Sequence, residues 1–326
     1  MVDLTTRYAG LKLKSPVIVS SSGLTQSADR IEKIAAAGAG AVVLKSLFEE
    51  QIRFEVGQLS SGSPDYPEAY DYLANYSREN TLSSYLHLIK EARSRVDIPV
   101  IASVNCVSSS EWVSFAKEIE KAGADAIELN VYFLPIDKNS PAEKFERVYF
   151  DLVTSVKAAT SLPVVVKLGN HFTNPVAVVD QLRVRGADAV VLFNRFYAPD
   201  INLDDLSFGT AEVLSSPADI RDSLRWVGIV SSEVEKIDIA ASTGIHSGQA
   251  MAKQILAGAV ATQVCSVLYR NGIDYIKVMT AELKAWMEKK GFHSINEMRG
   301  RLSYAKIKDP AMYERSQFIR YFSQMH

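Results

Sequence analysis

Short runs of apolar, mostly β-branched residues recur along the chain and predict buried β-strands. Most of the runs are apolar throughout instead of alternating with polar residues, which is typical of parallel strands covered on both faces. Polar residues gather at their C-terminal ends, although a strand that served only the core has no reason to end in Lys, Asn or Arg. The eight runs lie at residues 16–22, 41–46, 99–106, 126–133, 163–169, 189–195, 237–243 and 262–268.

Helical patterns lie between the runs and end at recurring glycine junctions. These junctions read GAGA at 38–41, GADA at 123–126 and 186–189, and GAVA at 258–261. A glycine just past a helix lets the chain turn tightly onto the next strand. The expected helices cover residues 27–37, 110–122, 140–159, 174–185 and 247–257.

The alternation of strands and helices predicts an α/β fold. Repeated βα units imply parallel strands with right-handed crossovers, and eight such units make a (β/α)₈ TIM barrel. A doubly wound open sheet is the alternative, but an open sheet usually gathers its site at one switch point. Polar ends on all the strands therefore favour the closed barrel. We expect a single domain over residues 1–326, with a barrel core at about 15–290.

Two long segments and a tail exceed a minimal barrel. Residues 49–80 follow the second strand, and residues 195–216 follow the sixth. Loops after strands lie on the site face of a barrel, so 49–80 is a candidate lid or partner surface. The C-terminal tail, 291–326, interleaves basic and aromatic residues. We expect it to pack on the barrel or on a neighbouring subunit and not to bind nucleic acid.

Composition narrows the class of protein. The 326 residues are 47% hydrophobic and 23% charged, with a formal net charge of −2. Nucleic-acid-binding proteins carry a basic excess that is missing here, and no apolar run approaches the roughly 18 residues of a membrane span. Asp3 and Arg7 come too early for a signal peptide. The two cysteines, Cys106 and Cys265, suit a reducing compartment, so we expect a cytoplasmic protein without membrane partners.

In a barrel, the C-terminal ends of the strands form the site. Lys45 and Lys167 hold equivalent places there, where a cation suits phosphate, a carboxylate or a heterocycle that gains negative charge, such as a reduced flavin. A Schiff-base lysine and a lysine that extends to solvent are the alternatives. No metal site is expected, because these ends lack a His, Asp and Glu cluster with ligand spacing. The other polar or small residues at the ends are Ser21, Ser22, Gly23, Ser46, Asn105, Asn130, Asn194, Arg195, Thr243, Gly244, Cys265 and Ser266.

Three asparagines and one turn suggest what these ends bind. Asn105, Asn130 and Asn194 form a set of donors and acceptors suited to a planar ring that alternates C=O and N–H, although each can instead cap the following loop. The sequence GIHSG at 244–248 suggests a phosphate cradle. Loops after strands seven and eight commonly hold phosphate through backbone N–H groups, but turns of this composition also occur without a ligand.

With these residues in view, the chain resembles the dihydroorotate dehydrogenase family of FMN enzymes over about residues 4–300. The motifs are SPVIVSSSG at 15–23, LKS at 44–46, ELN at 128–130, VKL at 166–168, FN at 193–194 and STGI at 242–245. The resemblance implies hydride transfer between a dihydropyrimidine-like CH–CH substrate and FMN, and a homodimer. The candidate catalytic residues are Lys45, Asn130, Asn194 and, by position, Tyr132. FMN binding is implied for Ser22, Gly23, Lys45, Ser46, Asn105, Asn130, Lys167, Thr243, Gly244, Cys265 and Ser266.

The substrate half departs from the family pattern. After its Asn the family continues Leu-Ser-Cys-Pro-Asn or Val-Ser-Ser-Pro-Asn, and that Cys or Ser accepts the substrate proton. Phe133 holds this position here and cannot accept a proton, Pro135 replaces the second Asn, and Arg195 replaces a Ser or Thr. Candidates for a replacement base, by position, are Tyr132, Tyr197, Cys106 and His171.

Three functions are therefore open. The first is an FMN oxidoreductase with an altered substrate, which would oxidise dihydroorotate slowly because a lost base costs about 10²–10⁴-fold in rate. The second is a non-catalytic or regulatory flavin-binding subunit, with 49–80 and the tail as partner surfaces. The third is a phosphate-binding barrel lyase that uses Lys45 or Lys167 as a Schiff base.

Overall fold

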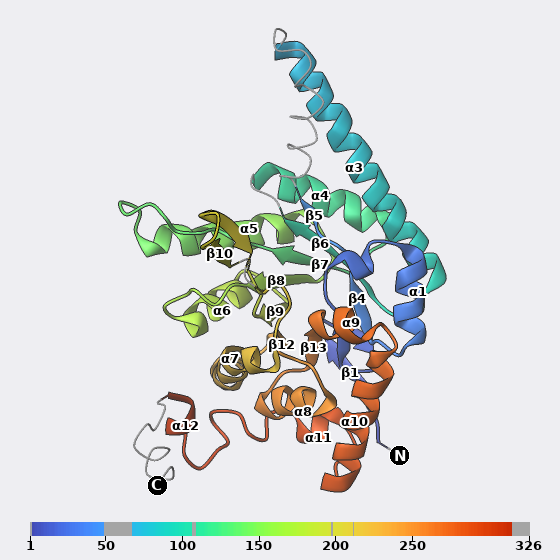
Figure 1. The fold of residues 1–326 in the computed structure, drawn as a ribbon, viewed down its shortest axis with the longest axis vertical. Coiled ribbons are helices and arrows are strands. Elements are labelled where there is room, and N and C mark those ends of the chain that lie inside the picture. The colour runs from blue at the N-terminus through green and yellow to red at the C-terminus, as the bar shows by residue number, and fades with distance from the viewer. Residues whose placement is uncertain (1, 49–66, 106–108, 197, 211, 315–326) are drawn as a thin grey trace.

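A computed structural model describes residues 2–48, 67–105, 109–196, 198–210 and 212–314 (Figure 1). Parallel strands follow one another around a ring, and the pairing of β4 with β6 closes it into a barrel. The predicted (β/α)₈ TIM barrel is therefore confirmed, and the open-sheet alternative is wrong. The barrel strands are β3 (Val17–Val19), β4 (Ala41–Val43), β6 (Val100–Asn105), β7 (Ala126–Asn130), β8 (Val164–Leu168), β9 (Ala189–Leu192), β12 (Asp238–Ser242) and β13 (Ala261–Val264).

Every predicted run contains one of these strands, but the strands end earlier than expected. The largest difference is in the run 262–268, because β13 ends at Val264 and helix α9 (Ser266–Asn271) begins two residues later. Cys265 lies between them with φ −146° and ψ −68°, which takes the chain out of the strand conformation. The polar residues therefore belong largely to the turns after the strands, where a barrel builds its site.

Helices surround the barrel (Figure 1). The predicted ones begin and end within two residues of the expected positions. Side chains cap two of them as the sequence suggests: Asn174 accepts a hydrogen bond from the backbone of Ala177, and Ser247 accepts one from Ala250. The helices around the barrel include α1 (Ala28–Ala36), α4 (Ser109–Ala122), α5 (Ala142–Ala159), α6 (Pro175–Val184), α7 (Ile220–Glu233), α8 (Gly248–Ala257) and α10 (Tyr275–Lys290).

Both long segments contain regular structure that the sequence analysis missed. Helix α3 (Pro67–Arg95) projects away from the barrel in Figure 1, so the prediction of a loop at 49–80 is wrong for 67–80. Its first residue is a proline, which fits the first turn of a helix. Residues 49–66 lie outside the described residues. The second segment contains an antiparallel hairpin, β10 (Pro199–Asn202) and β11 (Ser207–Thr210).

The N-terminal hairpin closes the other face of the barrel, and the C-terminal tail packs on the outer helices. Strands β1 (Thr6–Tyr8) and β2 (Leu11–Leu13) form a hairpin across the N-terminal ends of the barrel strands, where the Thr6 hydroxyl donates to the Val260 carbonyl. The tail includes α11 (Ile295–Met298) and α12 (Ala311–Glu314). Backbone amides of residues 300, 302 and 304 donate to carbonyls of α7 and α8, so the described tail packs on the barrel.

The side chains inside the barrel form layers. An apolar layer, including Ile18, Val43 and Val165, lies above Tyr8 of the N-terminal hairpin. Because side chains of a strand alternate with a period of two, the next inward layer comes two residues later along each strand. That layer is polar and buried, and consists of Ser20, Ser103, Glu128, Lys167, Ser242 and Gln263. The interior thus changes from apolar to polar towards the C-terminal ends of the strands.

Strand β4 is interrupted before this polar layer. It ends at Val43, and the chain rejoins β6 only at the short strand β5 (Leu47–Phe48). Opposite the gap, the hydroxyl of Tyr85 on α3 donates to the carbonyl of Ser103 at 3.0 Å and accepts from its amide at 2.7 Å. The Tyr85 side chain therefore takes the place of a missing strand partner and ties α3 to the barrel.

We expect Tyr85→Phe to destabilise the protein by about 2–4 kcal/mol, because it leaves a buried amide and a buried carbonyl without partners. Urea denaturation of the purified protein measures this. Tyr149→Phe is the control, since the hydrogen bond from the Tyr149 hydroxyl to the Val131 carbonyl is long, at 3.4 Å. Its cost should be about 1 kcal/mol or less. Equal costs for the two variants would contradict the role given to Tyr85.

Candidate active site

A cavity of about 390 Å³ opens at the C-terminal ends of the barrel strands. Its size is ordinary for a small-molecule or cofactor site. The residues that line it come from the ends of β3, β8, β9, β12 and β13 and from residues 213–215. Among the predicted site residues, it brings together Ser22, Lys167, Asn194, Thr243, Gly244, Cys265 and Ser266. Sequence reasoning missed Ser20, Ser215, Gln263 and Tyr269, which also line the cavity.

Lys167 is held in the cavity wall by a buried polar network. Its ammonium group donates to the Ser20 hydroxyl at 2.9 Å and to the Gln263 side-chain oxygen at 3.0 Å. The Gln263 amide nitrogen donates in turn to Glu128 at 2.5 Å. The other Glu128 oxygen lies 3.8 Å from the Lys167 nitrogen. A cation fixed in this way can stabilise negative charge on a bound ring.

A chain of serine hydroxyls borders the same cavity. The Ser46 hydroxyl lies 3.0 Å from that of Ser21, which lines the cavity, and 2.8 Å from that of Ser103 in the barrel interior. The Ser21 hydroxyl also accepts from the backbone of Ser46 at 2.9 Å. Ser46 is therefore linked to the cavity wall by its hydrogen bonds with Ser21. Because β4 is interrupted, Ser46 faces inward while the side chain of Lys45 is exposed and does not line this cavity.

Two of the three predicted asparagines meet. The Asn194 amide donates to the Asn130 side-chain oxygen at 2.9 Å. Asn130 also lies opposite Lys167 in the pairing of β7 with β8, which places the asparagine pair beside the network of Lys167. Asn105 is half-buried at the end of β6. Gly23 adjoins Ser22, and a side chain there would meet the hydroxyl of Tyr269 at 2.9 Å.

The turn after β12 has the shape of an anion cradle. Thr243 and Gly244 have φ of 75° and 77°, and the Thr243 hydroxyl donates to the Phe193 carbonyl at 3.0 Å. Consecutive residues in unusual turn conformations can point backbone N–H groups into one concavity. Gly244 also lies against the backbone of Ile220. The predicted phosphate turn at 244–248 therefore lines the cavity at Gly244 and Ile245.

The segment at residues 213–215 covers one side of the cavity. The amide of Ser215 donates to the Ser266 hydroxyl at 2.9 Å, and its hydroxyl lies 3.0 Å from the His246 ring nitrogen. Arg195 donates to the Glu212 carbonyl at 2.7 Å. Burial lowers the pKa of His246, so the imidazole is neutral near pH 7, and its tautomer decides which group donates in the hydrogen bond with the Ser215 hydroxyl.

A model of the dihydroorotate dehydrogenase family matches residues 3–287. The chain belongs to this family. The dihydroorotate dehydrogenase B (NAD(+)) catalytic subunit of Thermoplasma volcanium is 29% identical over 309 residues, which cover 92% of this chain and 98% of that protein. The subunit of the same name from Methanothermobacter thermautotrophicus is 28% identical, with 91% and 97% covered. The one from Anoxybacillus flavithermus is 32% identical over 213 residues, or 63% and 67%.

Membership in the dihydroorotate dehydrogenase family identifies the chain as a flavoprotein oxidoreductase that acts on a CH–CH group. Among the described residues, no helix is long and apolar enough to cross a membrane. Nor do those residues contain a group of three or more His, Cys, Asp or Glu side chains placed to hold a metal ion.

Aromatic rings gather in the turns that follow β7, β8 and β9. Phe133 packs edge-on against Tyr149 of α5, with ring centroids 6.0 Å apart. Tyr132 stacks on Phe196 at 3.7 Å, and His171 lies edge-on to Tyr132 at 6.1 Å. The turns after β7, β8 and β9 thus meet through aromatic side chains next to the asparagine pair.

Of the candidate replacement bases, His171 is in the protonation state that a base requires. Burial lowers the pKa of His171, so its ring is neutral near pH 7 and can accept a proton. Tyr132 is 37% exposed, with its ring against Phe196. Cys106 and Tyr197 lie outside the described residues. Burial raises the pKa of the Cys265 thiol, so this cavity residue is a neutral thiol and not a thiolate base.

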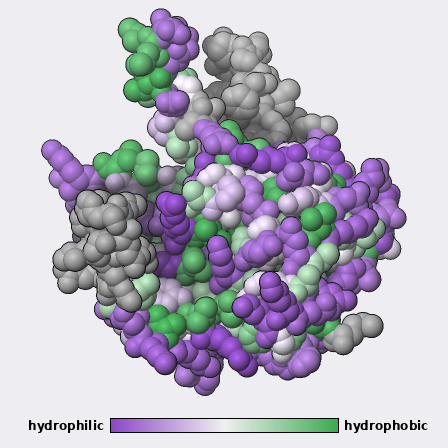
Figure 2. Space-filling view, turned by 60° about the horizontal axis from the view of Figure 1, so that its bottom comes forward, coloured by the Kyte–Doolittle hydropathy of each residue, from purple (hydrophilic) through white to green (hydrophobic). Residues whose placement is uncertain are grey.

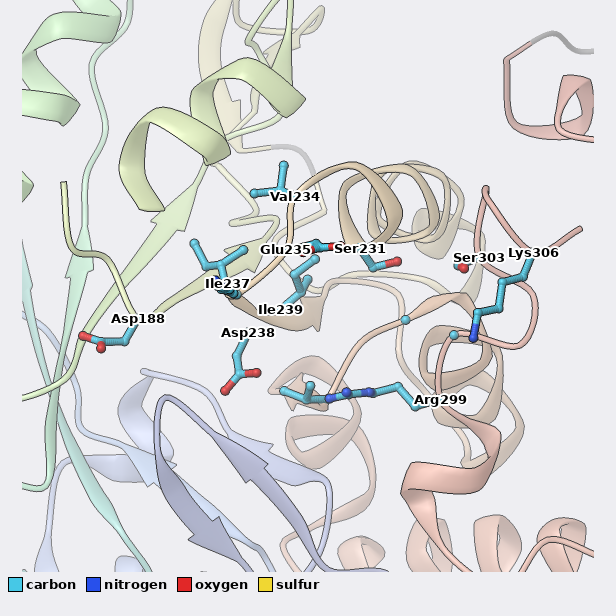
Figure 3. Close-up of a pocket in the computed structure, with 14 residues that line it drawn as sticks. Asp188, Ser231, Val234, Glu235, Ile237, Asp238, Ile239, Arg299, Ser303 and Lys306 are labelled. Atoms are coloured by element: carbon cyan, nitrogen blue, oxygen red, sulfur yellow. The ribbon is translucent and has the colours of Figure 1, made fainter. Parts of the chain in front are cut away.

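A larger cavity of about 540 Å³ lies at the opposite end of the barrel, where β9 and β12 begin (Figure 3). Its carboxylates serve the fold: Asp188 accepts from the backbone of Val164, and Asp238 accepts from that of Ala9. Burial raises the pKa of Asp238. Because the chemistry of TIM barrels is carried by the C-terminal ends of the strands, this cavity is not the active site.

Proposed function

We propose that the chain is an FMN-dependent oxidoreductase that transfers hydride between a dihydropyrimidine-like CH–CH substrate and FMN, with Phe133 in place of the usual base. The observation that supports this most is the buried ammonium group of Lys167 in the wall of the cavity. Membership in the dihydroorotate dehydrogenase family supports the reaction class. The aromatic rings around Tyr132 support a changed substrate.

The residues of the cavity fit FMN. Six of the residues predicted to bind FMN line it and would hold the cofactor, namely Ser22, Lys167, Thr243, Gly244, Cys265 and Ser266. Gly23 follows the cavity residue Ser22 in the chain. Ser46 and Asn130 are hydrogen-bonded to Ser21 and Asn194, which line the cavity. When bound, FMN supplies a ring that accepts hydride and gains negative charge.

The chain's own groups have separate tasks in this reaction. The Lys167 ammonium offers positive charge to the cavity and is kept in place by Ser20 and Gln263. The Asn130–Asn194 pair presents amide groups that can orient a planar substrate. A neutral His171 can hold the substrate proton.

The Schiff-base lyase is the weaker alternative. An attacking lysine must be a neutral amine, which requires an apolar or cationic surrounding. Lys167 instead donates hydrogen bonds to Ser20 and Gln263 and lies beside the carboxylate of Glu128, so its surrounding is neither apolar nor cationic. Lys45 is exposed and therefore lacks the desolvation that would activate it.

Anaerobic titration with dihydropyrimidines tests the proposal. We expect at least one compound from a set with and without a ring carboxylate to bleach the visible bands of the bound flavin. If neither the dihydropyrimidines nor NAD(P)H reduced the flavin, the non-catalytic flavin-binding subunit would be the correct reading. Trapping of a carbonyl compound by borohydride on a colourless protein would favour the lyase.

We also infer a homodimer, supported by an exposed apolar face of the β10–β11 hairpin. Ile201 and Phe208 lie directly opposite each other and are 56% and 81% exposed, whereas much of the surface in Figure 2 is hydrophilic. Apolar faces of this kind are commonly buried by a partner. Phe208→Asp should shift the sedimenting species from dimer to monomer. Asn202→Asp, which adds the same charge on the other face of the hairpin, should not.

A further inference from the structure

Glu128 is a buried carboxylate that lies behind the cavity wall. Its side chain is 0% exposed and faces the barrel interior, and it does not line the cavity. One of its oxygens accepts the hydrogen bond from Gln263, and the other accepts none from the described residues. An ionised carboxylate in such a place requires a cation nearby, because burial of an unpaired charge is costly.

Lys167 is the cation within 4 Å of Glu128 among the described residues. Two of its three ammonium protons go to Ser20 and Gln263. Gln263 therefore connects the two charges, since it accepts from Lys167 and donates to Glu128. The buried Tyr8 phenol is also close enough to feel this charge, since its pKa is raised by burial first and by Glu128 second. A phenol is neutral or negative and so cannot serve as the counter-charge.

We propose that Glu128 is a positioning residue that holds Lys167 through Gln263 and offsets its charge, and so sets how strongly the cavity stabilises negative charge on the flavin ring. The inference rests on the proposed function, because it concerns the flavin. It also predicts a property of the protein without flavin, namely that Glu128 and Lys167 stabilise each other. The two parts can be measured separately.

The substitution Glu128→Gln removes the charge and keeps the size and an oxygen that can accept from Gln263. The midpoint potential of the bound flavin should rise, because Lys167 is then unopposed and favours the reduced, negatively charged ring. A tenfold change in the reduction equilibrium is expected, which is about 30 mV for a two-electron couple. Lys167→Met should move the potential in the opposite direction, and Glu128→Asp should stay close to wild type.

Asp238→Asn is the control, because it neutralises a half-buried, hydrogen-bonded carboxylate at the far end of the barrel. It should leave the flavin potential unchanged. A merely structural role for Glu128 would lower stability in Glu128→Gln without a positive shift in potential. An unchanged or lowered potential in Glu128→Gln would therefore overturn the proposal.

The second measurement uses apoprotein and needs no cofactor. Unfolding equilibrium constants of wild type, Glu128→Gln, Lys167→Met and the double variant form a double-mutant cycle. We expect the two substitutions to be coupled by at least about tenfold. Additive effects would contradict the pairing of Glu128 with Lys167. A protein that binds no flavin would refute the proposed function, while the cycle would still decide whether Glu128 holds Lys167.

Discussion

Wild-type protein should oxidise dihydroorotate slowly, and Phe133→Cys should raise the rate by about 10²–10⁴-fold, the contribution of a positioned base. The phenyl ring of Phe133 has no group that accepts a proton, and it packs against Tyr149. A free cysteine has a pKa of about 8.5, and a thiol placed here supplies the proton acceptor, in its thiolate form, that the phenyl ring lacks. Single-turnover reduction of the bound flavin, followed anaerobically at its visible absorption band, measures the rate.

Phe133→Ala tests whether a gain in rate comes from the added base or from the space that the phenyl ring leaves. It opens the same volume without a proton acceptor, so it should stay as slow as wild type. Rapid reduction of wild type by dihydroorotate would contradict the account of Phe133. If Phe133→Ala and Phe133→Cys raised the rate of flavin reduction equally, access of the substrate to the site, and not proton transfer, would limit the wild-type reaction.

Gly244→Ala should destabilise the protein by about 2–5 kcal/mol and weaken flavin binding. Gly244 has φ of 77°, and an added Cβ would meet the backbone of Ile220 and lie 2.6 Å from the carbonyl carbon of Asp219. The left-handed conformation and the forced shift of the neighbouring backbone each cost about 1–3 kcal/mol. Urea denaturation of apoprotein gives the first effect, and titration of apoprotein with FMN gives the second.

Gly123→Ala is the control for backbone conformation alone. Gly123 has φ of 90°, and an added Cβ there has no atom within 4 Å. It should cost about 1 kcal/mol and leave flavin binding unchanged. If the two alanine variants lost the same free energy of unfolding, the close approach of Gly244 to the Asp219–Ile220 backbone would not contribute to the cost of Gly244→Ala.

The barrel could be predicted from the sequence because residues close together in the chain mark each strand and each helix end. Each strand is an apolar run of a few residues, and each helix end at Gly38, Gly123, Gly186 and Gly258 carries a glycine with positive φ. These features depend on residues close in sequence, and eight repetitions leave few possible topologies. The helical segment 67–80 was not predicted because its sequence, with three Tyr and several charged or amide residues, has only one large aliphatic residue to mark a buried face.

The site was predictable only in part. Lys167 and Thr243–Gly244 follow apolar runs directly, so their place in a barrel follows from topology. Lys45 has the same local pattern, but the interruption of β4 exposes its side chain and turns Ser46 inward. At that interruption the backbone of Ser103 bonds instead to Tyr85 of α3, about 40 residues from Lys45, and no local pattern reveals this contact.

Glu128 and Gln263 had a signal that could have been used. Both are large polar residues in the interior of short strands that are mostly apolar, AIELN and ATQV. A charge in such a run must find a partner within the barrel, and the period of two places it in the same inward layer as Lys167. Residues 213–215 gave no comparable signal, because Ser215 reaches the cavity through contacts with His246 and Ser266, far along the chain.

The absorption spectrum of the purified protein, with identification of the released ligand by mass, tests the central claim most directly. The account predicts a yellow protein that releases one FMN per chain, or a colourless apoprotein that becomes yellow when FMN is added. It also predicts that Gly244→Ala binds FMN more weakly than Gly123→Ala does. A stable, folded protein that neither contains nor takes up FMN would contradict it.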